Sequence, residues 1–150
     1  ILQTLRRTSS FKQKEQDAKC EALKLLEFVG LGSKAYDQVK NLPYGELKIL
    51  EIARALASKP KILLLDEPAA GLTLTEAQTL ASLIKRINDM GITIFIIEHN
   101  MEFVMNICHR IIVINFGEKI AEGTPFQVRL NKAVQEAYLG TNEEQGEKNA

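Results

Sequence analysis

Apolar residues recur at helical spacing in several stretches of this chain, with Lys and Glu filling the positions between them. A stripe of this kind is typical of a helix that packs one face against a core. The spacing predicts helices over residues 12–28, 46–58, about 74–89, 100–108 and 125–139. Thr73 or Thr75 is the expected N-cap of the helix at 74–89, and Gly91 is its expected stop.

Short apolar runs without polar interruption lie between these helices, at residues 62–65, 92–97 and 111–114. Uninterrupted runs of this length are typical of strands that are buried on both faces of a sheet. A turn at 115–118 should return the chain as an edge strand over 119–122. Strands that alternate with helices predict an α/β fold in which a parallel sheet is joined by crossover helices.

The composition excludes several classes of function. The chain has 150 residues, of which 45% are hydrophobic and 25% charged, as is ordinary for one soluble domain. Its formal net charge is zero, which argues against nucleic acid or an anionic lipid surface as a partner. Cys20 and Cys108 lack metal-ligand spacing and are expected to be reduced thiols. The apolar runs are far too short to span a bilayer, so no membrane insertion is expected.

An acidic pair, Asp66 and Glu67, follows the run at 62–65 directly. In open parallel sheets, ligands bind beyond the carboxyl ends of the strands. Asp66 is therefore placed to hold Mg²⁺, and Glu67 to orient a water molecule toward a γ-phosphate. Two carboxylates that only cap the start of a loop are the alternative, which the apolar run before them and Pro68 after them disfavour.

A glycine precedes the helix predicted at 46–58, because the loop at 33–45 ends in Tyr44 and Gly45. The first turn of a helix carries unpaired N–H groups and partial positive charge, and therefore binds phosphate. Gly45 would let the backbone approach a phosphate closely, although an ordinary loop-to-helix junction has the same pattern. His99 lies two residues past the run at 92–97, where an imidazole could contact a γ-phosphate, and a surface histidine is the alternative.

Taken together, these segments resemble the nucleotide-binding subunits of ABC transporters. The sequence L-P-Y-G-E at 42–46 is similar to the family's signature motif, usually L-S-G-G-Q, and I-L-L-L-D-E-P at 62–68 matches the Walker B motif. Residues 69–73 occupy the position of the D-loop, and His99 that of the switch histidine. The Tyr-containing signature, with L-E-I-A-R-A-L after it, is similar to subunits of branched-chain amino acid importers. The resemblance covers roughly residues 20–140.

The resemblance implies the C-terminal half of a P-loop NTPase-like (RecA-like) core, with part of the ABC helical subdomain. Residues 1–45 would belong to that subdomain, 46–140 to the ATPase core, and 141–150 to a polar tail. The implied reaction is ATP hydrolysis with Mg²⁺, in which Asp66 holds the metal and Glu67 and His99 are catalytic. The implied ATP contacts are Leu42, Tyr44, Gly45, Glu46, Ala70, Gly71 and Leu72.

The implied partners are a second ABC ATPase subunit, paired head-to-tail, and transmembrane permease subunits, with no nucleic acid. Such a subunit would lie peripherally on the cytoplasmic face of the plasma (inner) membrane and energise import. Pro43, Tyr44 and Thr73 depart from the usual motifs. The phosphate-binding G-x-x-x-x-G-K-[ST] loop (Walker A) is absent from these 150 residues and is expected upstream of Ile1, so we expect the chain alone to be inactive.

Two alternatives remain open at this point. The chain could supply only its signature motif, without hydrolysis, to a complete subunit. It could also resemble an ABC ATPase of DNA repair or translation, which the zero net charge disfavours. The transported substrate does not follow from these residues.

Overall fold

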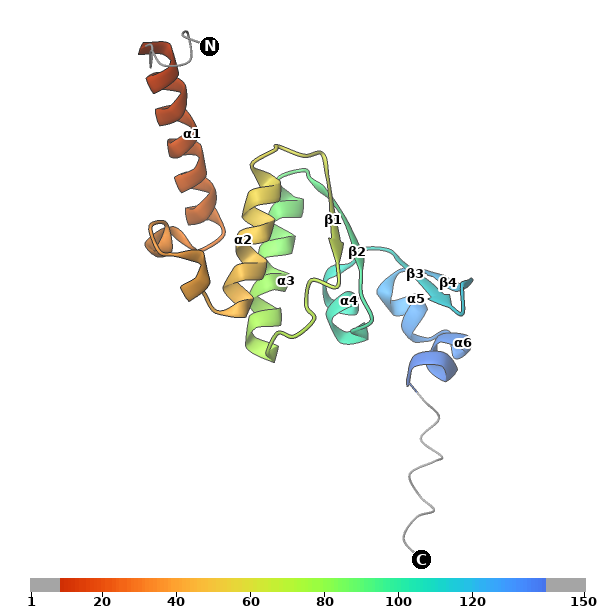
Figure 1. Ribbon diagram of the computed structural model, residues 1–150. Helices are drawn as coiled ribbons and strands as arrows, with labels where there is room; N and C mark the ends of the chain where they lie inside the picture. The colour runs from red at the N-terminus through yellow and green to blue at the C-terminus, as the bar shows by residue number, and fades with distance from the viewer. Residues whose placement is uncertain (1–8, 140–150) are drawn as a thin grey trace, which may run out of the picture. The chain divides into compact units, whose positions relative to one another are not determined.

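A computed structural model describes residues 9–139 of the chain, which divides into two compact units between Ile97 and Glu98 (Figure 1). The elements of the first are α1 (Ser9–Phe28), the 3₁₀ turns η2 (Gly32–Lys34) and η3 (Val39–Asn41), α2 (Tyr44–Leu56), β1 (Ile62–Asp66), α3 (Leu74–Asp89) and β2 (Thr93–Ile97). Those of the second are α4 (Met101–Ile107), β3 (Ile111–Asn115), β4 (Glu118–Gly123), α5 (Pro125–Arg129), α6 (Lys132–Val134) and the π turn η4 (Gln135–Leu139).

The two strands of the first unit are parallel neighbours, joined by helix α3. The register pairs Leu63 with Ile94 and Leu65 with Ile96. Because parallel strands require a long crossover connection, the helix between them is what brings them side by side. The predicted α/β fold with a crossover helix is confirmed for this pair.

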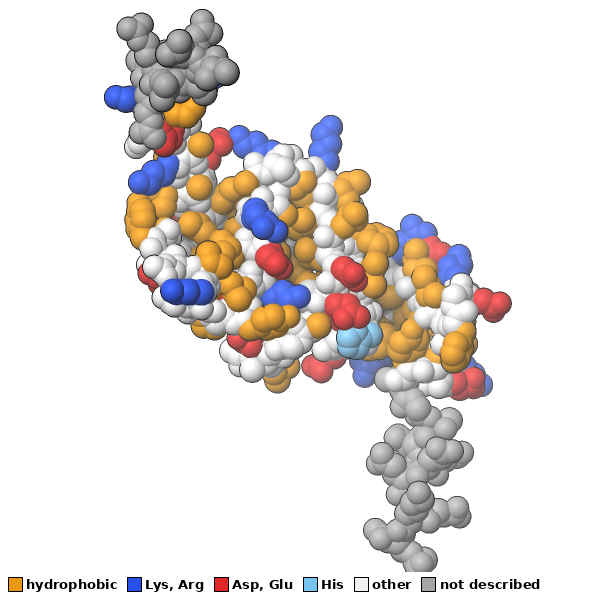
Figure 2. Space-filling model, in the orientation of Figure 1, with side chains coloured by type: hydrophobic (Ala, Val, Ile, Leu, Met, Phe, Trp, Pro, Cys, Tyr) orange, Lys and Arg blue, Asp and Glu red, His pale blue; other side chains and the backbone are white. Residues whose placement is uncertain are grey.

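Only one face of this parallel pair is covered, so the prediction that both strands are buried on both faces is wrong. Leu63 is 5% exposed, whereas Ile62, Leu64, Phe95 and Ile97 on the other face are 59%, 71%, 54% and 57% exposed. Apolar side chains are accordingly visible at the surface over β1 (Figure 2). The physical reason is that no element among residues 9–97 packs on the second face, and an apolar run does not reveal which element covers it.

The run at 111–114 forms a strand, but not in the parallel sheet as predicted. This strand, β3, pairs antiparallel with β4, and the two form a separate sheet. The connecting residues Phe116 and Gly117 both have positive φ, at 46° and 83°. A two-residue turn of that conformation matches the twist of a hairpin and favours local antiparallel pairing. The edge strand predicted after the turn is therefore confirmed.

The core of the first unit lies between α2, α3 and the covered face of β1. Its buried side chains come from the middle and last turns of α3, from one stripe of α2 and from β1, and they include Ile52, Ala53, Leu56, Leu63, Leu80, Leu83, Ile84 and Ile87. Helix α1 is attached through Phe28. Arg86 of α3 donates a hydrogen bond to the Phe28 carbonyl oxygen (2.8 Å), and its guanidinium lies 4.6 Å from the centre of the Phe28 ring.

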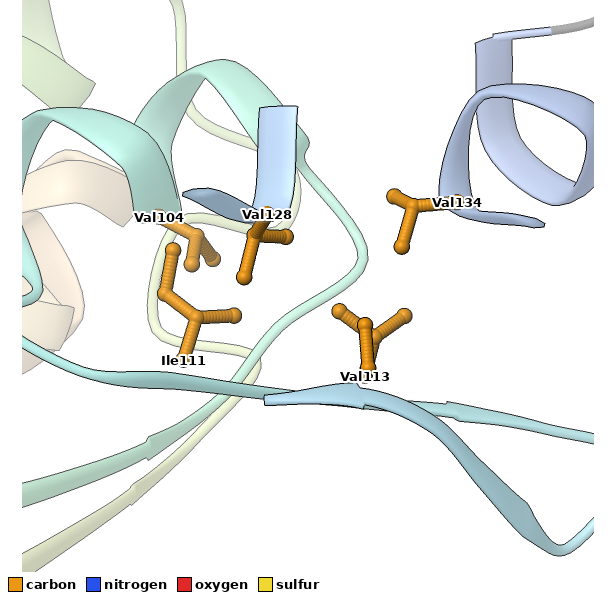
Figure 3. Close-up of a cluster of buried hydrophobic side chains, with 6 residues drawn as sticks. Val104, Ile111, Val113, Val128 and Val134 are labelled. Carbon is orange, nitrogen blue, oxygen red and sulfur yellow. The ribbon is translucent and has the colours of Figure 1, made fainter. Parts of the chain in front are cut away.

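The second unit has its own small core, in which Val128 of α5 and Val134 of α6 face Ile111 and Val113 of β3 (Figure 3). The prediction of one helix over 125–139 is wrong, because α5 ends at Arg129 and the chain starts again with Asn131 as the N-cap of α6. The Asn131 side chain accepts a hydrogen bond from the Val134 N–H, which satisfies a donor of the new helix.

Helix α3 begins with a complete capping box. The Thr73 hydroxyl accepts from the Glu76 N–H, and the Glu76 carboxylate accepts in turn from the Thr73 N–H (2.8 Å) and hydroxyl (2.7 Å). Of the two predicted caps, Thr73 is thus confirmed. Helix α2 begins at Tyr44, two residues earlier than predicted, and its N-cap Pro43 makes no side-chain capping bond. The starts of α2 and α3 therefore differ in whether a side chain satisfies their first N–H groups.

We predict that Thr73→Ala lowers the free energy of unfolding by about 1 kcal/mol, because it removes the acceptor that caps α3. Chemical denaturation followed by circular dichroism measures this difference. Thr79→Ala is the matched control, since the Thr79 hydroxyl only donates back to the Thr75 carbonyl oxygen within the exposed face of α3. Equal effects of the two substitutions would contradict the capping role.

Candidate functional site

Asp66 and Glu67 stand where β1 ends. Asp66 is the last residue of the strand and is paired in register with Ile97 of β2. The Glu67 N–H donates to the Ile97 carbonyl oxygen (2.9 Å), and Glu67 has a positive φ of 43°. Both side chains are exposed. The pair is thus at the carboxyl end of a parallel strand, the edge at which such sheets bind ligands.

Two consecutive turns carry the chain from the acidic pair to α3. The Ala70 N–H donates to the Glu67 carbonyl oxygen (3.1 Å), and the Leu72 N–H donates to that of Ala69 (3.2 Å). Gly71 is the third residue of the second turn and has a φ of 76°, which favours glycine. The predicted contact residues Ala70, Gly71 and Leu72 are therefore held in a defined loop.

The first turn of α2 presents backbone donors. Glu46 and Leu47 both donate their N–H groups to the Pro43 carbonyl oxygen (3.0 Å each). Within residues 9–139, no protein acceptor is found for the N–H groups of Tyr44 and Gly45. These N–H groups are of the kind that bind an anion at a helix N-terminus. Leu42, the first residue of the predicted motif, is half-buried just before this turn.

The structure brings the start of α2 against the loop and helix that follow the acidic pair. A Cβ atom at Gly71 would lie 3.1 Å from Cε1 of Tyr44, so the tyrosine ring packs on this glycine. A Cβ atom at Gly45 would lie 2.6 Å from the Glu76 Oε1. Both glycines thus permit close approach of two segments that are more than 20 residues apart in sequence.

Three charged residues at this contact are absent from the sequence predictions. Lys48 lies over the Tyr44 ring, with its Nζ 5.6 Å from the ring centre. Glu76 belongs to the capping box described above, and Lys34 of η2 donates to both carboxylate oxygens of Glu46 (2.5 and 2.6 Å). Only the capping pattern T-x-x-E could have pointed to one of them, Glu76. The other two depend on tertiary contacts.

A groove between α2 and β1 adjoins the acidic pair. Its lining combines polar residues with apolar side chains of both elements, and consists of Lys48, Glu51, Ile52, Ala55, Leu63, Leu64, Leu65, Asp66 and Pro68. Asp66 and Lys48 therefore border the same groove with opposite charges. This places the exposed carboxylate of Asp66 next to open space rather than in a packed core.

His99 follows in the second unit, where its N–H donates to the Glu98 carboxylate (3.1 Å). Its imidazole is exposed. Its predicted role next to Asp66 and Glu67 stays a prediction. Among residues 9–139, no group of three or more His, Cys, Asp or Glu side chains is arranged to hold a metal ion by itself. No helix in the same range is long and apolar enough to cross a membrane.

Two family models match the chain. The model described as ABC transporter matches residues 2–70, and the model described as branched-chain amino acid ATP-binding cassette transporter matches residues 118–144. An alignment at 46% identity to a branched-chain amino acid transport ATP-binding protein covers 91% of this chain. This chain belongs to the ABC transporter family of ATP-binding proteins. The first match contains the signature-like segment at 42–46 and the acidic pair, and the second lies entirely in the other unit.

Named relatives agree with this assignment. The chain is 46% identical over 137 residues to the high-affinity branched-chain amino acid transport ATP-binding protein LivG of Escherichia coli K12, an alignment that covers 91% of this chain and 54% of that protein. It is 43% identical over 141 residues to BraF of Pseudomonas aeruginosa, a protein of the same description, which covers 93% and 55%. The chain thus spans about half the length of these relatives.

Solved structures show the same fold. The ADP conformation of MJ1267, an ATP-binding cassette of an ABC transporter, matches with a TM-score of 0.74 and 34% identity, over 81% of this chain and 49% of that one. A nucleotide-free ATP-binding cassette from an ABC transporter matches with a TM-score of 0.70 and 30% identity. The α/β, P-loop NTPase-like fold class is thereby confirmed.

We predict that Gly71→Ala destabilises the fold more than Gly91→Ala. Both glycines have a positive φ, at 76° and 85°, so each substitution costs about 1–2 kcal/mol of backbone strain. A Cβ at Gly91 meets no atom within 4 Å, whereas one at Gly71 presses on Tyr44. Denaturation measures the difference, and adding Tyr44→Ala should reduce it. Equal destabilisation by both glycine variants would contradict the contact between Tyr44 and the loop.

We predict that Glu76 titrates below the usual range of a glutamate. The Thr73 N–H, and after it the Thr73 hydroxyl, stabilise the carboxylate and lower the Glu76 pKa. A lowered folded-state pKa stabilises the fold above the unfolded value, about 4.3, and this contribution is lost as the pH falls through the folded pKa. Carbon-13 NMR of the carboxyl group measures the titration.

Thr73→Val tests the cause of this shift, because it removes the hydroxyl and keeps the N–H. The Glu76 pKa should rise toward the usual range without reaching it. Glu21 serves as the internal control, since its pKa is lowered by the hydrogen bond from Lys59 and should not respond to this substitution. A Glu76 pKa that does not change in Thr73→Val would rule out the hydroxyl as a cause.

Proposed function

We propose that this chain is part of the ATP-binding subunit of an importer for branched-chain amino acids, in which ATP hydrolysis drives transport. One observation carries the proposal. The acidic pair at the end of β1 leads into a loop that packs on the uncapped first turn of α2 through Gly71 and Tyr44. In this proposal, groups that bind metal, activate water and bind phosphate lie on one unit of a family member whose relatives are transport ATP-binding proteins.

Each residue has a role in this proposal. Asp66 binds Mg²⁺ through its exposed carboxylate, which fits a metal that prefers few carboxylates together with water and phosphate oxygens. When bound there, the metal would neutralise phosphate charge in the transition state. Glu67 holds the attacking water and accepts its proton, and His99 donates a hydrogen bond to the γ-phosphate.

The first turn of α2 serves a second ATP rather than the one at Asp66. Leu42, Tyr44, Gly45 and Glu46 would contact the ATP that is held by the neighbouring subunit of a head-to-tail pair. The N–H groups of Tyr44 and Gly45 support this role, because they have no acceptor within residues 9–139. The loop at Ala70, Gly71 and Leu72, which packs on Tyr44, would border the same interface.

Further polypeptide is part of the proposal. The uncovered face of the β1–β2 pair exposes several large apolar side chains, among them Leu64 at 71%. We propose that another element covers this face in the working protein. We propose that this element also carries the phosphate-binding loop. Transmembrane permease subunits, a second ATPase subunit and a peripheral position on the cytoplasmic face of the inner membrane complete the proposed assembly.

Co-expression of this chain with the part of the E. coli relative that the alignment does not cover tests the proposal. We expect the two polypeptides to copurify and to hydrolyse MgATP together, while this chain alone does not. Glu67→Gln should lower turnover by at least about 100-fold, because it removes the base that accepts the proton of the attacking water. A coupled phosphate-release assay measures the rate.

Glu118→Gln is the control for this substitution, since Glu118 is an exposed glutamate at the start of β4 and has no proposed role. Its turnover should equal that of the unsubstituted pair. A pair that copurifies and binds MgATP without hydrolysing it would contradict the proposed function, and so would a Glu67→Gln variant that keeps full turnover.

A further inference from the structure

Glu46 carries a carboxylate in the first turn of α2, where the proposed function requires an anionic phosphate to bind. Lys34, in the turn η2, donates to both oxygens of this carboxylate, at 2.5 and 2.6 Å. The Glu46 side chain is 28% exposed and the Lys34 side chain 35%. In the ion pair of Glu21 with Lys59, the exposed fractions are 61% and 75%. The Lys34–Glu46 ion pair is therefore the more sheltered of the two, and less screened by solvent.

A second carboxylate lies beside the same turn of α2. The Glu76 Oε1 atom is so close to Gly45 that a Cβ there would be 2.6 Å away. Glu76 is held by the N–H and hydroxyl of Thr73, neither of which is a cation. Glu46 in the first turn of α2 and Glu76 beside Gly45 thus both add negative charge near this helix terminus, which disfavours an approaching phosphate.

We propose that Lys34 is a positioning residue that neutralises Glu46 and so keeps the first turn of α2 able to receive a phosphate. This inference rests on the proposed function, because it concerns the same contact. Without Lys34, the charge of Glu46 would offset the partial positive charge of the helix terminus and repel the anion. With Lys34 in place, its positive charge neutralises the Glu46 carboxylate, and the helix terminus keeps its attraction for phosphate.

A purely structural role for this ion pair would have different consequences. The pair joins η2 to α2, so its loss could simply loosen that junction. In that case, removing either charged group, or both together, would weaken the fold in a similar way. If the charge of Lys34 is what matters, removing both groups should recover phosphate binding that is lost in Lys34→Met. The reason is that neither an uncompensated carboxylate nor an uncompensated ammonium is left.

Titration of the ¹⁵N-labelled chain with sodium tripolyphosphate, followed by NMR of the Tyr44 and Gly45 amide signals, tests the inference. We expect Lys34→Met to weaken binding on the order of tenfold, and Glu46→Gln to strengthen it severalfold. The double variant K34M/E46Q should bind more tightly than Lys34→Met, and Lys34→Arg should retain binding. Signal dispersion and thermal unfolding report whether each variant is folded.

Lys59→Met is the matched control, since it removes one lysine from an ion pair at the other end of α2 and should leave the titration unchanged. Lys34→Met binding like the unsubstituted chain would overturn the inference, as would a folded K34M/E46Q that stays weak. If Lys34→Met does not fold, Glu46→Gln decides alone, and unchanged binding overturns the inference.

This experiment is separable from the test of the proposed function, because it needs neither turnover nor a second polypeptide. A chain whose Tyr44 and Gly45 amides do not respond to tripolyphosphate overturns the role of Lys34 even when the co-expressed pair hydrolyses ATP. An inactive pair overturns the proposed hydrolysis, whereas a charge-dependent titration still supports Lys34 as the residue that neutralises Glu46.

Discussion

The parallel pairing of β1 with β2 is the constraint on which the candidate site depends. Its register ends at Asp66 and Ile97, and the Glu67 N–H extends the pairing by one hydrogen bond to the Ile97 carbonyl oxygen. The acidic pair is therefore held at the carboxyl edge of the sheet by backbone hydrogen bonds. The positive φ of Glu67 then turns the chain away from the strand and into the loop that reaches α3.

Close contacts at two glycines connect the loop after the sheet, and the helix that follows it, to α2. Gly71 lies under the Tyr44 ring, and Gly45 lies against the carboxylate of Glu76, which is itself fastened by Thr73. A side chain at either glycine would have to displace the Tyr44 ring or the Glu76 carboxylate. The loop after the acidic pair and the start of α3 are thus both in contact with the first turn of α2.

Much of the site can be predicted from the sequence, because the patterns that indicate it involve residues close together in the chain. An apolar run followed by Asp66 and Glu67 predicts a strand with carboxylates at its end, and the T-x-x-E pattern at Thr73 marks the start of α3. Lys34 gives no such signal. Its partner Glu46 is 12 residues away, and only the turns η2 and η3 between them bring the two charges together.

The sequence by itself thus determined the strands, the longer helices, the family, and the order of the motifs along the chain, since each depends on residues close to one another. Tertiary structure decided which strands pair and which faces are covered. The tight turn at Phe116 and Gly117 gave β3 a local antiparallel partner, and these two strands form a sheet separate from that of β1 and β2. The second faces of β1 and β2 stay open because burial depends on a covering element, and their apolar runs contain no information about where that element lies.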